Sequence, residues 1–113
     1  MNTSRSLAAL VCLLLSGCSG ADLLSEDSCP PEGTDLTYDN FGRVFFYQHC
    51  VRCHGDANAY SSRSFTTVTS IRSQIDRVYA NAAAGNTFMP PGPDDPSEQE
   101  RDDLAEWLVC GAP

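Results

Sequence analysis

The spacing of apolar positions predicts a small all-α domain of three to four helices, because no two segments have the pattern of paired strands. The first helix is predicted over residues 41–50, with Asp39 or Asn40 as its N-cap. Residues 55–69 lack helical periodicity and predict a loop. The second helix is predicted over residues 70–85, where apolar residues recur every three or four positions. That apolar face consists of Ile71, Ile75, Val78 and Ala82.

Residues typical of helix ends bound the second helix and a third. Ser70 is the predicted N-cap of the second helix, and Gly85 is its predicted end. The third helix is predicted over residues 97–110, with Ser97 as its N-cap and Gly111 directly after it. Its apolar stripe contains Leu104, Trp107 and Leu108. The proline-rich segment before this helix excludes regular structure.

The N-terminal residues have the layout of an export signal. Residues 7–15 form an uninterrupted apolar run after one positive charge. The run is shorter than the roughly 20 residues that a membrane-spanning helix needs, but it suits a signal peptide. The following segment LSGC resembles the lipobox of bacterial lipoproteins, which implies that Cys18 becomes a lipid-modified N-terminus. We therefore divide the chain into a signal peptide (1–17), an acidic tether (18–37) and a folded domain (38–113).

The charge of the chain excludes several classes of partner. The formal charge is −8, and it becomes −9 when Arg5 leaves with the signal peptide. Such an acidic surface disfavours binding to nucleic acid or to anionic lipid. It predicts a partner with a basic docking surface. The lipid anchor and the export signal together predict a position at a bacterial membrane facing the periplasm, with Ser19 weakly favouring the outer membrane.

The six cysteines fall into groups with different expected roles. Cys12 leaves with the signal peptide, and Cys18 is the expected lipidation site. Cys29 and Cys110 lie near the two ends of the folded part, and an oxidising compartment favours a disulfide between them. Two separate free thiols are the alternative. The remaining pair, Cys50 and Cys53, belongs to a motif.

Residues 50–54 read CVRCH, which is the C-x-x-C-H signature of covalent haem attachment. Two thiols at this spacing add to the two vinyl groups of the porphyrin, and His54 then ligates the iron. A thioredoxin-like site would need a βαβ pattern, which the sequence lacks. A zinc site would need a fourth ligand, for which only His49 is available, badly placed next to Cys50. A local disulfide is a third alternative.

The second axial position of the iron needs another ligand. Met89 is the only methionine after the signal peptide, and the chain contains no lysine. His49 lies on the attachment helix and does not easily reach the other face of the haem. Met89 is therefore the predicted sixth ligand, in a loop stiffened by Pro90 and Pro91. Met/His ligation raises the reduction potential and closes the iron to small ligands.

With these residues the chain resembles a small monohaem cytochrome c of the Met/His type, from about Tyr38 to Gly111. Gly42 and Phe46 stand eight and four residues before Cys50, as in that family, and Trp107 matches the aromatic residue of its last helix. The resemblance implies that the first and last helices cross at Gly42. The family usually has a proline about ten residues after the motif, whose carbonyl accepts the histidine N–H. No proline stands between His54 and Pro90, so the acceptor stays unassigned.

The expected function is electron transfer by one haem c, without substrate chemistry. A haem-based sensor with a labile sixth ligand, an electron-input subunit of a larger oxidoreductase and a structural lipoprotein are the alternatives. The residues that are candidates for pairing with haem propionates are Arg63, Arg72 and Arg77. The candidates for lining the haem pocket are Tyr60, Phe65 and Phe88.

Overall fold

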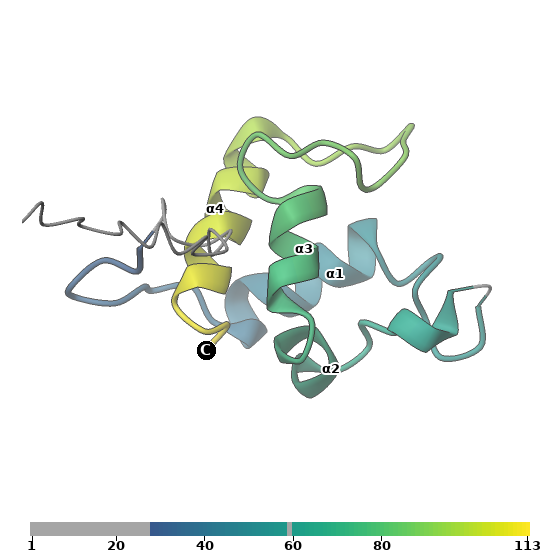
Figure 1. Ribbon diagram of the computed structural model, residues 1–113, viewed down its shortest axis with the longest axis horizontal. Coiled ribbons are helices and arrows are strands. Elements are labelled where there is room, and N and C mark those ends of the chain that lie inside the picture. The colour runs from purple at the N-terminus through teal and green to yellow at the C-terminus, as the bar shows by residue number, and fades with distance from the viewer. Residues whose placement is uncertain (1–27, 59) are drawn as a thin grey trace, which may run out of the picture.

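The fold was analysed in a computed structural model, which describes residues 28–58 and 60–113 (Figure 1). The predicted signal peptide, Cys18 and the first part of the predicted tether lie outside the described residues. The helical elements of the described part are η1 (Tyr38–Gly42), α1 (Arg43–His49), η2 (Ser61–Arg63), α2 (Val68–Arg72), α3 (Ile75–Ala82) and α4 (Glu98–Val109). The described residues contain no strand, which confirms the all-α fold.

The first helix begins earlier than predicted. Thr37, rather than Asp39 or Asn40, is the N-cap of η1, which continues directly into α1. The hydroxyl of Thr37 accepts a hydrogen bond from the Asn40 N–H, and the Asn40 side chain accepts one from the Thr37 N–H. This reciprocal capping satisfies two N–H groups that have no partner within the helix. Asn40 is therefore not the N-cap itself: it lies three residues after Thr37 and completes the cap from inside the helix.

The predicted second helix is two shorter helices, α2 and α3, separated at Ser73 and Gln74. The cap of α2 is Thr67, and Ser70 occupies the reciprocal position of its capping box. The Ser73 hydroxyl and the Gln74 amide both donate to the Ser70 carbonyl, at 2.8 and 3.0 Å. Such side-chain bonds compete with the helical ladder, which explains the break. The break does not expose the predicted apolar face, since Ile71 is fully buried.

Helix α3 ends at Ala82, before the predicted stop at Gly85. Ala83 is extended, and Ala84 has a positive φ of 50°. The N–H of Ala84 donates to the carbonyl of Arg101 on α4, at 2.9 Å. A tertiary hydrogen bond therefore determines where α3 ends, and Gly85 is not needed to end the helix.

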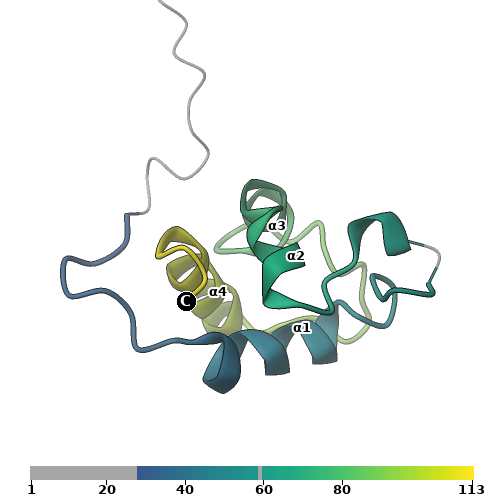
Figure 2. The same ribbon diagram turned by 90° about the horizontal axis from the view of Figure 1, so that it is seen from below.

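Helix α4 agrees with the prediction at both ends. Ser97 caps it, with Glu100 completing the capping box, and Gly111 follows its end with a φ of 85°. Figure 2 shows α4 crossing the start of α1. Gly42 lies at this crossing, against the buried ring of Trp107. The core around the crossing includes Phe45, Phe46, Leu104 and Leu108.

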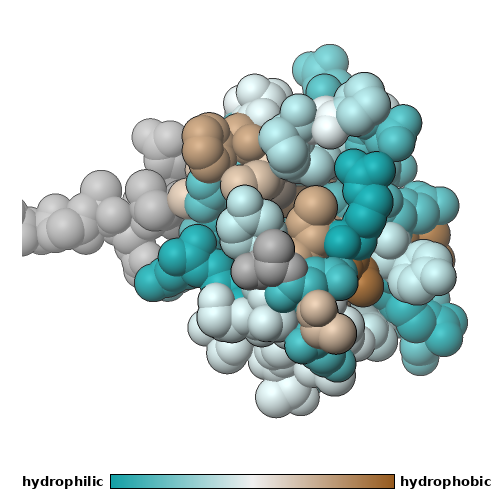
Figure 3. Space-filling model, turned by 90° about the vertical axis from the view of Figure 1, so that its right-hand side faces the viewer, coloured by the Kyte–Doolittle hydropathy of each residue, from teal (hydrophilic) through white to brown (hydrophobic). Residues whose placement is uncertain are grey.

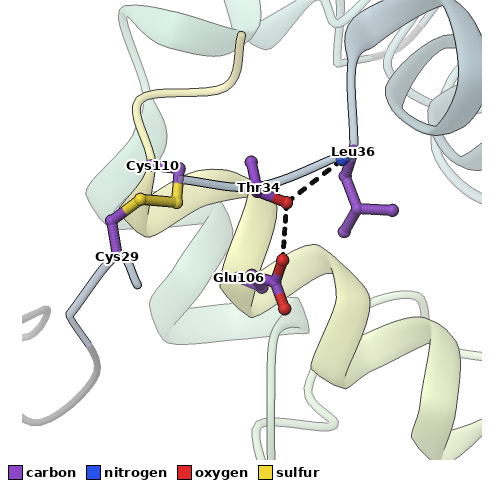
Figure 4. The surroundings of a disulfide bond; sticks show 5 residues. All are labelled: Cys29, Thr34, Leu36, Glu106 and Cys110. Carbon is purple, nitrogen blue, oxygen red and sulfur yellow. Dashed lines mark hydrogen bonds between the residues drawn. A yellow bond between two sulfur atoms is a disulfide. The ribbon is translucent and has the colours of Figure 1, made fainter. Parts of the chain in front are cut away.

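A disulfide joins Cys29 to Cys110, with a Cα–Cα distance of 4.7 Å (Figure 4). The Thr34 hydroxyl donates to the Glu106 carboxylate and accepts from the Leu36 N–H. Leu36 packs against the core. The segment is thus tied to α4 at Cys29 and Thr34, so the part of the predicted tether that the structure describes is attached to the domain. None of the helices within residues 28–58 and 60–113 has the length and apolar character required to cross a bilayer.

Candidate functional site

One cavity of about 370 Å³ gathers the residues that the sequence singled out. Its volume is within the range of small-molecule and cofactor pockets, roughly 300–1,000 Å³. The residues of the C-x-x-C-H motif and Met89 line it together. The aromatic residues predicted to line a haem pocket also do so: Tyr60, Phe65 and Phe88. Figure 3 views this end of the molecule, where apolar surface lies among hydrophilic side chains.

The motif forms a tight turn immediately after α1. The N–H groups of Cys53 and His54 both donate to the Cys50 carbonyl, at 3.1 and 2.9 Å. The Asn58 amide donates to the carbonyls of Val51 and Arg52, at 2.8 and 2.7 Å. These hydrogen bonds satisfy the backbone N–H and carbonyl groups of the turn. Both thiols and the imidazole make none of these bonds, and they line the cavity.

Gly55, directly after His54, allows the chain to leave this turn. A Cβ at position 55 would lie 2.9 Å from the Val51 carbonyl oxygen and 2.9 Å from the Asn58 amide nitrogen. A side chain there would displace the turn that presents His54. This role of Gly55 was not predicted from the sequence, although a glycine directly after the motif was a signal for a close backbone approach.

The imidazole of His54 is oriented by a backbone carbonyl. Its Nδ1 lies 3.1 Å from the Arg63 carbonyl oxygen. A carbonyl only accepts, so Nδ1 carries the proton and Nε2 keeps a free lone pair. The ring also contacts the rings of Tyr60 and Phe65, with centroid distances of 5.4 and 5.0 Å. Arg63 thus supplies the acceptor that the sequence left unassigned, nine residues after the histidine.

The thiol of Cys50 lies in an apolar environment. Burial raises the pKa of Cys50 to about 12, an effect that the positive charge of Arg101 partly offsets. Before any modification this thiol is therefore neutral at physiological pH. Both Cys50 and Cys53 are free cysteines, which excludes a local disulfide between them in this structure.

The loop between α3 and α4 brings Met89 to the cavity. The Met89 N–H donates to the Asn81 carbonyl at 2.8 Å, and the Met89 carbonyl accepts from Arg101 Nη1 at 2.9 Å. Both backbone groups of Met89 are thus fixed, whereas its thioether lines the same cavity as the imidazole of His54. The methionine is only partly buried in the protein alone.

His49 also lines the cavity, but its ring nitrogens face other groups. Nδ1 lies 3.3 Å from the Asp94 carbonyl oxygen, and Nε2 lies 3.5 Å from a Glu100 carboxylate oxygen. The ring packs on Phe45, with a centroid distance of 5.0 Å. His49 therefore links the attachment helix to the loop before α4 and to the first turn of α4.

Three arginines line the cavity, and no Asp or Glu of the described residues does. Two of them, Arg63 and Arg77, were candidates from sequence, and the third is Arg52. Arg72 lies elsewhere, where its Nε donates to the Ala112 carbonyl at 2.9 Å. The mouth of the cavity is thus positive, although the chain as a whole is acidic. An anionic group fits this mouth best.

The donor groups of the cavity fit a haem c. The free thiols of Cys50 and Cys53 could form covalent bonds with the porphyrin. The Nε2 lone pair of His54 and the sulfur of Met89 could each ligate the iron. Three guanidinium groups match the two carboxylates of the porphyrin. The described residues contain no cluster of His, Cys, Asp and Glu suited to a bare metal ion.

Comparison with known proteins agrees with this reading of the site. A family model described as cytochrome C oxidase, cbb3-type, subunit III, matches residues 40–108. No match was found among curated proteins or among solved structures. The matched segment includes the C-x-x-C-H motif, Met89 and most of α4. The family consists of c-type cytochrome domains, which transfer electrons by means of haem. The chain belongs to this family of small c-type cytochrome domains.

Proposed function

We propose that the chain carries one haem, attached covalently through Cys50 and Cys53, and that it transfers electrons with His54 and Met89 as iron ligands. The observation that supports this most strongly is the common cavity of all four residues. The haem, when bound, supplies one-electron cycling between ferrous and ferric iron. The protein's part is to hold the haem in place and to set its potential.

His54 is the proximal ligand in this proposal. The bond from Nδ1–H to the Arg63 carbonyl fixes the tautomer and the ring orientation, and it makes Nε2 more basic. The contacts with Tyr60 and Phe65 also restrict rotation of the ring. The ligand is therefore oriented before the iron arrives, and a change of oxidation state requires little movement of the protein.

Met89 is the sixth ligand in this proposal. Its backbone is held at both the N–H and the carbonyl, and its thioether lines the cavity. The competing side chain, His49, is engaged by Asp94 and Glu100. A thioether ligand favours ferrous iron and blocks the site to small molecules, which suits an electron carrier better than a gas sensor.

Arg52, Arg63 and Arg77 are the proposed partners of the haem propionates. Arginine suits this task because its planar fork matches a carboxylate. Once these charges are neutralised, the remaining surface is dominated by acidic residues. We therefore propose that the redox partner presents a basic docking surface. Electron exchange with it should slow as salt is added, and a rate that is insensitive to salt would contradict this part.

We propose further that the domain is exported and anchored by lipid at Cys18, facing the periplasm. The apolar run and the lipobox-like LSGC support this location. A role as the electron-input subunit of a larger oxidoreductase is the second candidate, and the description of the matching family favours it. Mass spectrometry of the full chain from membranes tests the anchor: a Cys18→Ser variant should lose its acyl chains and its association with the membrane, and retention of either would contradict it.

The covalent attachment is tested by producing the full chain in a bacterium that attaches c-type haem. The mass of the unfolded protein should include one haem, and acidified organic solvent should not extract it. A Cys50→Ser/Cys53→Ser double variant should carry no covalent haem. Cofactor that is extracted from the wild-type chain, or a mass without haem, would contradict the proposal.

A further inference from the structure

Arg101 on α4 is the one charged residue in the buried interior of the described chain, with an exposed fraction of 4%. It lies on the apolar face of its helix, together with Leu104, Ala105 and Leu108. Burying a charge is costly unless hydrogen bonds or an opposite charge compensate for it. The described residues provide no ion pair for it. An arginine is therefore held in the core without a carboxylate, which calls for a functional reason.

The guanidinium bonds to the segment that leads to Met89. Its Nη1 lies 2.8 Å from the Ala82 carbonyl and 2.9 Å from the carbonyls of Asn86 and Met89. The carbonyl of Arg101 itself accepts the Ala84 N–H at 2.9 Å. One residue of α4 thus contacts residues 82, 84, 86 and 89 in turn, from the end of α3 to the methionine.

The end of α3 explains part of how the charge is tolerated. The C-terminus of a helix carries unsatisfied carbonyls and a partial negative charge, which favours a cation. Ala82 is the last residue of α3, and its carbonyl is one of the three acceptors. The Met89 carbonyl is another of these acceptors, at 2.9 Å, so the buried charge lies directly against the backbone of the proposed iron ligand.

We propose that Arg101 is a positioning residue, whose buried cation holds the Met89 segment over the haem cavity and raises the reduction potential of the haem. The inference rests on the proposed function. A fixed positive charge in a low-dielectric interior opposes the additional positive charge of ferric iron, so it favours the ferrous state. A surface arginine would have little effect, because water and salt screen it.

The test uses the full-length holoprotein in four forms: wild type, Arg101→Gln, Arg101→Lys and Arg43→Gln. Arg43→Gln is the matched control, since it removes the same charge from an exposed position on α1. Three properties are measured: the reduction potential, the ferric charge-transfer band of methionine ligation, and hydrogen exchange of the Met89 amide. Hydrogen exchange of the Met89 amide reports on the stability of the Met89 segment and does not depend on electron transfer.

We expect Arg101→Gln to have a lower potential than the wild type, a weakened methionine band and faster exchange of the Met89 amide. Arg101→Lys keeps the positive charge, so its potential, methionine band and Met89 amide exchange should lie close to those of the wild type. Arg43→Gln should match the wild type in all three properties. An Arg101→Gln protein that matches Arg43→Gln in all three properties would overturn the proposal. Equal losses in the Gln and Lys variants would overturn the role of the charge.

A measurement on the wild type decides the matter if the Gln variant does not accumulate with haem. The guanidinium NMR signals of Arg101 should show slow rotation and slow exchange, unlike those of exposed arginines. A freely rotating Arg101 would overturn the proposal. The failure of the underlying function is distinguishable, because then the wild type itself would lack covalent haem or the methionine band.

Discussion

Gly42 touches the ring of Trp107 so closely that a Cβ at position 42 would lie 2.7 Å from Cζ2 and 2.8 Å from Cη2 of the indole. The indole is fully buried and cannot move aside. Its Nε1–H also donates to the carbonyl of Pro113, which fixes the ring further. This contact sets the crossing of η1–α1 and α4, and so the position of Cys50 relative to the loop that carries Met89.

The Gly42→Ala variant should be less stable than the wild type. In an exposed helix interior this change stabilises by about 1 kcal/mol. Here the clash with Trp107 should outweigh that gain and leave a net loss of about 1–3 kcal/mol in the free energy of unfolding. Denaturant unfolding measures it. Gly85→Ala is the matched control, because a Cβ there meets open space. A stabilised Gly42→Ala protein would contradict the close crossing.

Removing the disulfide should lower stability without changing the haem site. The Cys29→Ser/Cys110→Ser variant loses a cross-link over a sequence separation of 81 residues. Losses of about 2–5 kcal/mol are typical for small exported domains. Thermal unfolding should show a lower midpoint, and the visible spectrum should stay the same because both cysteines lie outside the cavity lining. A reductant that leaves the wild-type midpoint unchanged would argue against the bond.

Acid should weaken the cap of α4. Hydrogen bonds from the backbone and side chain of Ser97, with a smaller contribution from His49, hold the pKa of Glu100 below its usual value of 4.5. Because the folded-state pKa is the lower one, the stabilisation is present above about pH 4.5 and is lost as the pH falls through the folded-state pKa. Glu100→Gln should cost about 0.5–1 kcal/mol at neutral pH and reduce the loss of stability in acid.

The control for this prediction is Glu98→Gln. Glu98 lies in the same first turn, but its side chain makes no hydrogen bond within the part of the chain that the structure describes. Unfolding of both variants is followed by circular dichroism between about pH 3 and about pH 7, a range that includes the usual pKa of a glutamate side chain. Identical pH profiles for the two variants would show that the contacts of Glu100 with Ser97 and His49 contribute nothing.

Met89→Ala should keep the covalent haem but lose the sixth ligand. The reduction potential should fall, the ferric charge-transfer band should disappear, and carbon monoxide should bind to the reduced protein. Val44→Ala serves as a control, because Val44 is 48% exposed and lies outside the cavity lining. A Met89→Ala protein with the spectrum and potential of the wild type would exclude Met89 as a ligand.

The sequence predicted those parts of the molecule that depend on local pattern. The C-x-x-C-H motif identifies the proposed attachment residues by spacing alone, and the pattern around Ser97 and Gly111 predicted the ends of α4 correctly. The family resemblance, carried by Gly42, Phe46 and Trp107 around that motif, is confirmed by the matching family model.

Other features depend on contacts that a linear pattern does not contain. The acceptor for His54 is a backbone carbonyl, at Arg63, and the residue type at that position does not reveal it. Side-chain bonds from Ser73 and Gln74 divide the predicted second helix, whereas periodicity alone suggests one helix. Arg101 was missed because a charged residue is usually exposed, although its place on the apolar face of α4 was a signal.

The most direct test of the central claim is the visible spectrum of the reduced wild-type protein, recorded before and after addition of carbon monoxide. We expect a c-type haem spectrum that carbon monoxide leaves unchanged, because in our proposal His54 and Met89 hold the iron from both sides. The Met89→Ala protein provides the positive control for binding. A shift of the wild-type spectrum on addition of carbon monoxide would contradict the account and indicate an open or labile sixth site.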